Sequence, residues 1–339
     1  MDLDRDRRVL IVLGLYRPDL DLLSRQLQSL VVQSHRNLEI FVCPDGPLEP
    51  AARSLIEGFA DRRIRILEDS ARVGVHRNFA RGLNGAIGES RSDADLFAFC
   101  DQDDFWHPEK LARQIAGFAD PQTSLCHSDA RIVSQNGDLL APSLFRHESR
   151  SRSASFADLL IMNSVTGMTA VFRHDVARAA QPFPLSGCRY ILHDHWIALV
   201  ASLLGNVRFI EEPLVDYTQH ATNVMGARSW DGRFPRARAP SDRRAYLRNC
   251  FRQFSWRRRA REMLRRTLAE FPSARGRLAA EPSRALFDCN SAWAAGLLLS
   301  LARRLRGERR QADQMWRIWR GKTLYCSSRS ANSMETLIR

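Results

Sequence analysis

The first 120 residues alternate between short apolar runs and longer segments with helical periodicity. Four segments are expected to form strands: Val9–Leu13, a continuous apolar run that suits a strand buried on both faces, and Leu38–Cys43, Arg63–Leu67 and Leu96–Cys100. Apolar residues recur at helical spacing in four further segments: Pro18–Ser34, Leu48–Ala60, His76–Ile87 and Pro108–Phe118. This alternation predicts an α/β fold, with a mostly parallel central sheet and helices on both of its faces.

The pattern is less regular after residue 120. An Asn-Gly pair within Ser134–Asp138 is a hairpin signal. The segment Arg146–Ser155 is polar, basic and rich in serine, which favours a mobile loop. Beyond it we expect one buried helix and then two short strands: Trp196–Leu204, Val207–Ile210 and Leu214–Tyr217.

Charge divides the chain into two regions. Residues 230–339 contain 26 Lys+Arg against 9 Asp+Glu, whereas the first 229 residues carry a small negative net charge. This contrast predicts one domain over residues 1–229 and an arginine-rich, mainly α-helical C-terminal extension over residues 230–339. Basic amphipathic helices that carry tryptophan commonly lie on anionic membrane surfaces, so we expect this extension to contact one. The alternative is a helical extension packed on the first domain with its arginines in solvent.

The seven cysteines and the apolar segments exclude several classes of protein. The cysteines are scattered without a CxxC pair, which indicates neither a disulfide framework nor a zinc site. A reduced, cytoplasmic compartment is their simplest location. No apolar stretch reaches the eighteen residues of a membrane-spanning helix, and the N-terminal apolar run is typical of a first strand, not of a signal peptide.

Three carboxylates directly follow the expected strand Leu96–Cys100. They are Asp101, Asp103 and Asp104, and Asp101-Gln102-Asp103 forms a D-x-D sequence. Carboxylate oxygens suit a hard cation such as Mg²⁺ or Mn²⁺ bridging to substrate phosphates. They also suit a helix-entry loop, because carboxylates are favourable near a helix N-terminus. The spacing alone leaves both interpretations open.

Other polar residues stand where a ligand could be reached. Asp45 follows the second strand, so it lies at the same edge of a parallel sheet as the D-x-D sequence. Asp194, between His193 and His195, precedes an apolar helix and is either its N-cap or a general base. His220 follows the last strand and is either a loop histidine or a metal or phosphate contact.

Seven stretches, taken in order from about Val9 to Ala227, resemble the family 2 glycosyltransferases and, within them, the bacterial rhamnosyltransferase-like members. The stretches are VLIVLGLYRPDLDLLSRQLQSLVVQS, LEIFVCPDGP, RVGVHRNFARGL, FCDQDDFWHPEKL, NSVTGMTAVFRHD, HDHWIALVASLLGNVRFIEEPLVDY and TQHATNVMGA. The resemblance covers about two-thirds of the chain. It implies a GT-A fold and inverting transfer of a sugar from a nucleotide-diphosphate donor.

The resemblance also implies roles for individual residues. Asp103 matches the metal-binding carboxylate, with Asp101 and His220 as further ligands of a divalent cation, Mg²⁺ or Mn²⁺. Asp45 matches the aspartate that recognises the nucleotide base, and Tyr16 lies in the loop that packs on that base. Asp101 and Gln102 complete the donor site. Asp194 matches the catalytic base that deprotonates the acceptor hydroxyl.

Two positions depart from the family pattern. Pro44 stands where a second aspartate usually precedes the glycine, and Thr218 stands where an arginine commonly precedes Gln-His. Both departures concern how the donor nucleotide and its diphosphate are held. Neither removes the metal carboxylates or the base.

The resemblance therefore implies an enzyme that moves a single sugar, rhamnose by preference, from dTDP-rhamnose or a UDP-sugar. Its acceptor would be a surface-glycan or lipid-linked saccharide at the inner face of a bacterial cell membrane. Two alternatives come from other classes: an arginine-rich nucleic-acid-binding protein, for which we find no recognition fold, and an inactive glycosyltransferase-like binding module. The retained Asp101, Asp103 and Asp194 argue against the second.

Overall fold

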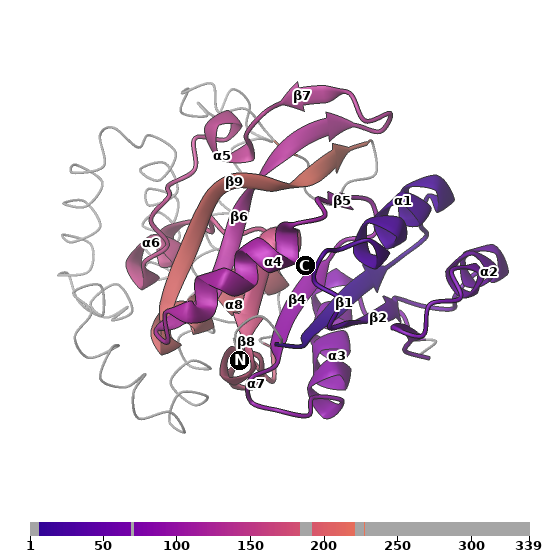
Figure 1. The fold of residues 1–339 in the computed structure, drawn as a ribbon, viewed down its shortest axis with the longest axis horizontal. Helices are drawn as coiled ribbons and strands as arrows, with labels where there is room; N and C mark the ends of the chain where they lie inside the picture. Colours follow the sequence, from indigo (N-terminus) through magenta and orange to yellow (C-terminus); the bar gives the residue numbers. More distant parts are fainter. Residues whose placement is uncertain (1–6, 69–70, 184–191, 221–226, 228–339) are drawn as a thin grey trace, which may run out of the picture. The chain divides into compact units, whose positions relative to one another are not determined.

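The computed structural model describes residues 7–68, 71–183, 192–220 and 227 (Figure 1). All elements except helix α6 (Phe156–Ile161) belong to one compact unit, and that unit carries the features analysed below. The expected helices and membrane contact of residues 230–339 lie outside the described residues. Within the part of the chain that is described, no helix has both the length and the apolar character to cross a membrane.

The first four strands form the predicted parallel half of the sheet. Their bounds are β1 Val9–Leu15, β2 Leu38–Pro44, β3 Ile64–Ile66 and β4 Leu96–Cys100. They pair in parallel in the order β3-β2-β1-β4. Residues of β1, β2 and β4 are almost all buried, because helices cover both faces of this part of the sheet.

Alternate residues of the strands face different helices. Odd-numbered residues of β1, such as Ile11, share a core cluster with Leu23 and Leu27 of α1 (Leu20–Val31) and with Leu111 of α4. Phe99 of β4 faces the other side and contacts the ring of Phe79 in α3, with ring centroids 5.1 Å apart. The helices of this half are α2 Pro50–Gly58, α3 Val75–Gly88 and α4 Lys110–Ile115, which continues as the 3-10 helix η1 Ala116–Ala119.

The second half of the sheet is mixed. The sheet continues from β4 through β8 Ala170–Arg173, β6 Thr123–Ser134 and β9 Asn206–Gln219 to β5 Phe105–Trp106, and β7 Leu139–Ala141 pairs with β6. Strand β8 runs antiparallel to β4 and to β6, whereas β6 and β9 are parallel. The mostly parallel sheet with helices is thus confirmed, with antiparallel strands added in its second half.

One expectation for this half was wrong. The two short strands expected at 207–210 and 214–217 are one strand, β9, because irregularities in its register with β6 allow pairing to continue past Pro213. The segment Arg146–Ser155 is a loop, as expected, beyond its first two residues. It begins inside α5 (Leu144–His147), and the Arg150 side chain is only 13% exposed because buried hydrogen-bond partners hold it.

The remaining expectations for this half were confirmed. The Asn-Gly pair lies in the turn between β6 and β7. The buried helix is α8 (His193–Leu204), in which Trp196 is fully buried. Two further elements join the unit: α7 (His174–Ala179) and the 3-10 helix η2 (Gly167–Thr169).

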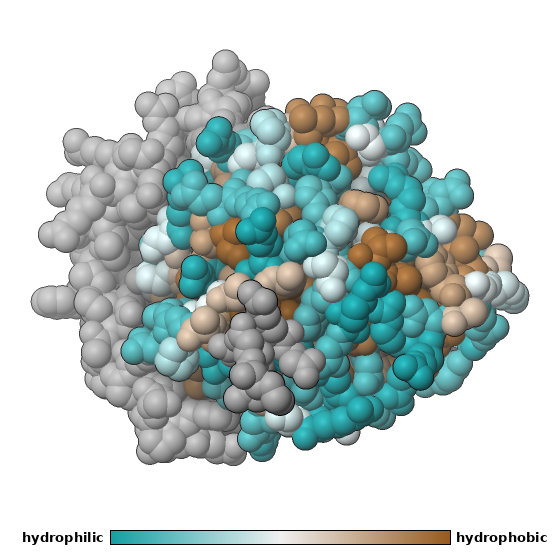
Figure 2. Space-filling model, viewed as in Figure 1, coloured by the Kyte–Doolittle hydropathy of each residue, from teal (hydrophilic) through white to brown (hydrophobic). Residues whose placement is uncertain are grey.

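The described surface is mainly hydrophilic in the view of Figure 2, with small apolar areas between charged ones. Large apolar side chains that are exposed among the described residues are few: Tyr16, Leu20, Val32, Leu139 and Leu140. Tyr16 lies beside a pocket considered below.

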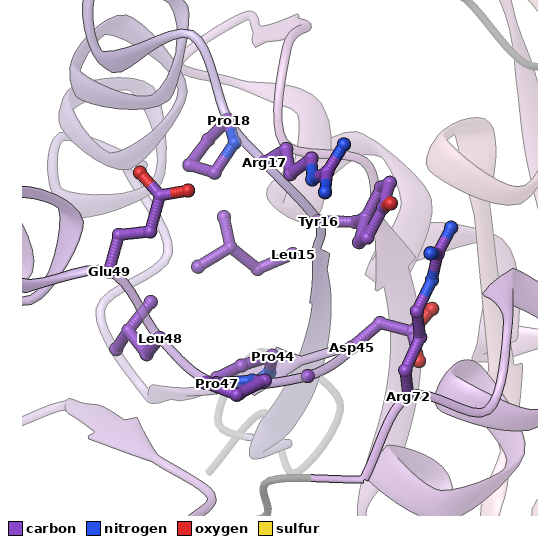
Figure 3. A pocket seen from close by; sticks show the side chains of 11 residues that line it. Leu15, Tyr16, Arg17, Pro18, Pro44, Asp45, Pro47, Leu48, Glu49 and Arg72 are labelled. Atoms are coloured by element: carbon purple, nitrogen blue, oxygen red, sulfur yellow. The ribbon is translucent and has the colours of Figure 1, made fainter.

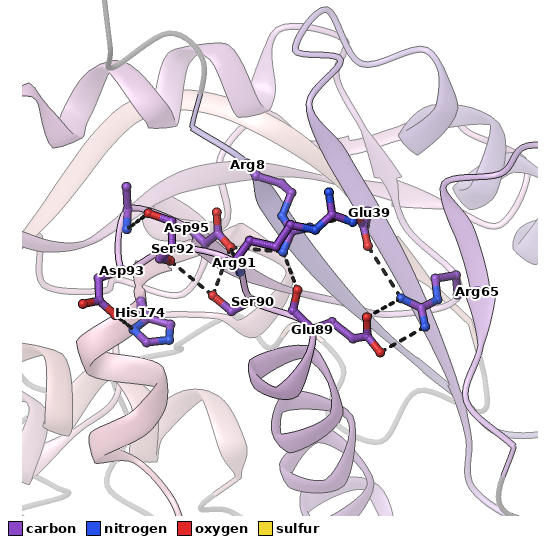
Figure 4. Close-up of polar contacts among 11 residues, drawn as sticks. Arg8, Glu39, Arg65, Glu89, Ser90, Arg91, Ser92, Asp93, Asp95 and His174 are labelled. Atoms are coloured by element: carbon purple, nitrogen blue, oxygen red, sulfur yellow. Dashed lines mark hydrogen bonds and ion pairs between the residues drawn. The ribbon is translucent and has the colours of Figure 1, made fainter.

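A cluster of ion pairs ties the strands together at the edge of the sheet where they begin (Figure 4). Arg8, which is 8% exposed, donates to Glu39 of β2 over 2.9 Å and to Asp95 beside β4 over 3.1 Å. It also donates to the backbone carbonyl of Glu89 over 2.6 Å. Because Asp95 is 5% exposed, removing its cation would leave a buried charge unpaired.

We expect Arg8→Met to lower the free energy of unfolding by about 3 kcal/mol, the lower end of the cost of breaking a buried ion pair. Urea denaturation measures this change. The matched control is Arg53→Met, which removes an exposed arginine paired with Glu68 over 2.9 Å and should leave stability nearly unchanged. Equal losses in the two variants would contradict this account of the cluster.

Candidate active site

The turn after β4 concentrates negative charge. Asp101 and Asp103 are partly exposed, whereas Asp104 is 1% exposed. Burial, followed by the charges of Asp103 and Asp194, raises the pKa of Asp101 to about 7. Burial also raises the pKa of Asp103, and burial together with Asp103 and Asp101 raises the pKa of Asp104 well above its usual range. Negative charge at this turn is therefore incompletely compensated.

His220 joins this turn from the end of β9. Its Nε2 lies 2.8 Å from Oδ2 of Asp103, and the two side chains are 11% and 17% exposed. Thr218, two residues earlier, donates its backbone N–H to Oδ1 of Asp104 over 3.0 Å. The structure thus brings together Asp103 and His220, which the sequence places far apart.

One oxygen in this cluster has no protein partner. Oδ2 of Asp104 is buried and makes no hydrogen bond to any of the described residues. No group of three His, Cys, Asp or Glu side chains within those residues already forms a metal-binding set. The donors present, carboxylate oxygens with one imidazole, are nevertheless of the kind that divalent cations accept.

Gln102 connects the acidic turn to the loop after β1. Its Oε1 accepts the backbone N–H of Tyr16 over 2.7 Å, and its Nε2 donates to the Tyr16 carbonyl over 3.1 Å. This pair of hydrogen bonds fixes the Tyr16 backbone beside the D-x-D sequence. Gln102 therefore acts on the predicted donor site through the Tyr16 loop.

A pocket of about 330 Å³ lies next to Tyr16, at the ends of β1 and β2 (Figure 3). Tyr16, Arg72 and Asp45 lie on one side of it, and Pro18, Leu48 and Glu49 on the other. The complete lining is Leu15, Tyr16, Arg17, Pro18, Pro44, Asp45, Gly46, Pro47, Leu48, Glu49 and Arg72. Pro44, the departure noted in the sequence, is part of this wall.

The carboxylate of Asp45 holds the entry to α3. Its Oδ1 accepts the backbone N–H of Val73 over 2.6 Å, and both of its oxygens lie 3.0 Å from the N–H of Gly74. Gly74 has φ +85°, a conformation that favours glycine. Asp45 thus borders the predicted pocket and also fixes the backbone of the segment that carries Arg72.

Two arginines that the sequence did not single out flank Tyr16. The guanidinium of Arg72 lies 4.5 Å from the centre of the Tyr16 ring, and that of Arg17 lies 5.5 Å from it. Tyr16 itself is 37% exposed. The only signal for Arg72 in the sequence is its place in the RVGV stretch.

Asp194 lies in the first turn of α8. The N-cap of this helix is Leu192, so the interpretation of Asp194 as an N-cap is wrong. Its Oδ1 accepts the backbone N–H of His195 over 2.7 Å. Burial raises the pKa of Asp194 to about 6, against the lowering effects of the His195 hydrogen bond, the Arg150 charge and the nearby Gly167 backbone. The Asp194 carboxyl is therefore ionised near neutral pH, and it accepts a proton more readily than an ordinary aspartate.

Aromatic packing sets the position of Asp194. The ring of its neighbour His193 stacks on Phe79 of α3 at 3.8 Å and meets Phe99 of β4 edge-on at 4.9 Å. Burial, with the nearby His76, lowers the pKa of His193 well below its usual range, so the ring is neutral. A Cβ added to Gly167 would lie 2.9 Å from the His193 Nε2, so only glycine lets η2 come this close.

The acidic turn and Asp194 come from segments that are more than ninety residues apart. They meet because the Phe79, Phe99 and His193 rings hold the start of α8 against the end of β4. Phe99 lies two residues before Asp101, and its ring meets that of His193, which directly precedes Asp194, so the two carboxylates lie on neighbouring segments. The Asp194 charge accordingly contributes to the raised pKa of Asp101. A pocket, an acidic turn and a basic carboxylate thus share one edge of the sheet.

A sequence model described as "Glycosyl transferase family 2" matches residues 15–179. This segment, just under half of the chain, is therefore similar to glycosyl transferase family 2. The matched residues contain the pocket and the acidic turn, and Asp194 lies beyond them.

Two relatives match part of the chain. A hyaluronan synthase of Streptococcus pyogenes is 31% identical over 118 residues, which are 34% of this chain and 27% of the synthase. The Escherichia coli UDP-Glc:alpha-D-GlcNAc-diphosphoundecaprenol beta-1,3-glucosyltransferase WfgD is 25% identical over 145 residues, 41% of this chain and 54% of WfgD. The chain thus spans about a quarter and about half of the lengths of these relatives.

A solved structure has the same fold. S. aureus TarS 1-349, in complex with UDP-GlcNAc, superposes with a TM-score of 0.52 at 13% identity, covering 95% of this chain and 93% of TarS. This likeness confirms the predicted GT-A fold.

A buried lysine begins α4, a few residues after the acidic turn. Lys110 is fully buried, its Nζ lies 3.5 Å from the centre of the Trp106 ring, and it donates to Oε1 of Gln114 over 2.8 Å. Burial lowers the pKa of Lys110 to about 7, against smaller raising effects of Cys100 and Cys126. In the unfolded chain this amine would titrate near its ordinary value of 10.5.

This shift makes stability depend on pH. Between pH 7 and 10.5 the unfolded chain binds more protons at Lys110 than the folded one, so Lys110 opposes folding less and less as pH rises. We expect the free energy of unfolding of the wild type, relative to Lys110→Met, to increase by roughly 3 kcal/mol from pH 7 to pH 9.5. Denaturation of both proteins at each pH measures it. The control Arg113→Met, on the exposed side of the same helix, should show no such trend, and a constant difference for Lys110→Met would contradict the shift.

Proposed function

We propose that this chain is an inverting glycosyltransferase that moves a single sugar from a nucleotide-diphosphate sugar to an acceptor hydroxyl. The observation that carries this proposal is the meeting of Asp194 with the acidic turn at one edge of the sheet, beside the pocket bordered by Tyr16 and Asp45. Positioning of a donor and an acceptor next to a base is itself a large part of catalysis.

The donor nucleotide would occupy the pocket. A ring stacked near Tyr16 would have the Arg72 and Arg17 charges beside it and Asp45 at the pocket wall. The motif resemblance favours rhamnose from dTDP-rhamnose. A UDP-sugar is the other candidate, because the name of the relative WfgD specifies UDP-Glc.

A divalent cation, Mg²⁺ or Mn²⁺, fits the acidic turn. The raised pKa values of Asp101 and Asp103 and the unpartnered buried oxygen of Asp104 mark negative charge that the protein leaves uncompensated. We propose that Asp103, Asp101 and His220 hold the cation. Such a cation would neutralise charge on the leaving diphosphate.

Asp194 would act as general base. A carboxylate with a pKa of about 6 is ionised at neutral pH and can accept the proton of the acceptor hydroxyl as its oxygen attacks the anomeric carbon. The attack would come from the face opposite the departing diphosphate, which inverts the anomeric configuration. The backbone hydrogen bond from His195 holds the carboxylate in place during this step.

The proposed acceptor is a surface-glycan or lipid-linked saccharide. The relative WfgD supports it, because its name specifies a diphosphoundecaprenol-linked sugar. We further propose that the protein works in the cytoplasm at the inner face of a bacterial membrane, with residues 230–339 contacting anionic lipid. A polymer-forming activity is the second candidate, since part of a hyaluronan synthase is similar to part of this chain. The length of the saccharide product distinguishes transfer of a single sugar from polymer formation.

We expect Asp194→Asn to lower the turnover number by at least about 100-fold, the usual scale of a positioned general base. Asparagine keeps the size and the hydrogen-bond acceptor of the side chain, so nucleotide affinity should stay within about twofold. Sugar transfer is measured by mass spectrometry of acceptor saccharides, using dTDP-rhamnose and UDP-sugars as donors.

The matched control is Asp175→Asn. Asp175 also lies in the first turn of a helix and also accepts the backbone N–H of the next residue, over 2.8 Å, but it is exposed and outside the pocket. Its replacement should leave turnover unchanged. Full activity of Asp194→Asn would exclude Asp194 as the base, and binding of none of these nucleotides by the folded wild type would overturn the proposed function.

A further inference from the structure

Arg150 lies in the segment that sequence composition suggested was a mobile loop, yet it is one of the more constrained arginines of the unit. Its side chain is 13% exposed. Its Nε donates to Oε2 of Glu148 over 2.9 Å, and its Nη1 donates to the carbonyl of Ser164 over 3.2 Å and to Oγ1 of Thr166 over 2.5 Å. One face of the guanidinium lies 5.7 Å from the Phe145 ring.

The hydrogen-bond partners of Arg150 belong to the segment that packs beside Asp194. Thr166 is the N-cap of η2, and its carbonyl accepts both the backbone N–H and the hydroxyl of Thr169. The backbone of the next residue, Gly167, lies close enough to lower the pKa of the Asp194 carboxyl. Its Cα also borders the Cβ of Asp194, since a Cβ added to Gly167 would lie 3.7 Å from it.

The other end of η2 is held separately. The side chain of Gln114 donates to the carbonyl of Thr169 over 2.6 Å and to that of Cys126 over 3.2 Å. Lys110 in turn donates to Gln114. Arg150 therefore fixes the beginning of this short turn, and the Gln114 side chain fixes its end.

The geometry points to Arg150 as a positioning residue for sugar transfer: by holding Ser164 and Thr166, it fixes the Gly167 backbone against Asp194. This inference rests on the proposed function, in which Asp194 is the base. Arg150 itself need not touch either substrate. Its positive charge also favours the ionised form of Asp194, in keeping with this position.

A charged side chain suits this task for a physical reason. A guanidinium can donate in several directions at once from a rigid plane, so one side chain can hold a carbonyl and a hydroxyl on the same segment. Burying that charge is costly unless it is paired, and Glu148, whose side chain is 7% exposed, provides the pair. An uncharged side chain that cannot donate would leave η2 without this support.

The test compares steady-state kinetics of Arg150→Met, Arg150→Lys and Thr166→Val with the wild type. We expect Arg150→Met to lower the turnover number by about 30-fold to 100-fold, the scale of a small displacement of a catalytic group, with the donor KM within about threefold. Thr166→Val should reproduce part of the loss. Arg150→Lys should regain part of it, because an ammonium can still reach one of the two acceptors.

The matched control is Arg152→Met, two residues along the chain, where the arginine is 58% exposed and pairs with Glu211. Its turnover number should equal that of the wild type. If Arg150→Met keeps full turnover while Asp194→Asn is inactive, the positioning role is wrong and the proposed function stands. If Arg150→Met changes the donor KM as much as the turnover number and Arg150→Lys restores nothing, Arg150 only supports the fold and the inference is also overturned. If Asp194→Asn is fully active, the proposed function itself fails.

Discussion

Burying carboxylates together costs free energy, and the turn after β4 holds three of them, Asp101, Asp103 and Asp104. Within the described residues, only His220 and the Thr218 backbone are seen to offset their charge directly. The pKa values of all three carboxyls are consequently raised. A protein keeps such a costly group where an opposite charge from outside completes it, and a divalent cation with a diphosphate is the partner that the donor set fits.

The rest of the unit holds two other features beside this turn. Gln102 fixes the Tyr16 loop and thereby one wall of the pocket. The stacked His193 and Phe79 rings fix the start of α8 and thereby Asp194. The proposed cation site, the proposed nucleotide pocket and the proposed base are thus set by different contacts, so a single substitution can remove one of them and leave the others in place.

The sequence predicts the first half of the fold well because strands β1, β2 and β4 are buried on both faces and are continuous apolar runs. Strand β6 cannot be predicted from a continuous apolar run in this way. It buries polar residues such as Asp129, whose oxygens are satisfied by Ser143 and by the Phe145 backbone, partners that no local pattern reveals. Asp101, Asp103 and Asp194 were predicted as site residues from motifs and resemblance, and the structure places them at the same edge of the sheet. Arg150 was missed, because its polar surroundings are typical of a loop and its partners lie 14 and 16 residues away.

The central claim is that the acidic turn is completed by a divalent cation that carries the donor nucleotide. Isothermal titration calorimetry of dTDP, UDP and GDP, each with and without Mn²⁺ or Mg²⁺, tests it on the wild type and on Asp103→Asn. The account predicts that at least one of these nucleotides binds the wild type only when the cation is present, and that the variant loses this binding. Equally tight binding without the cation, unchanged in Asp103→Asn, would contradict it.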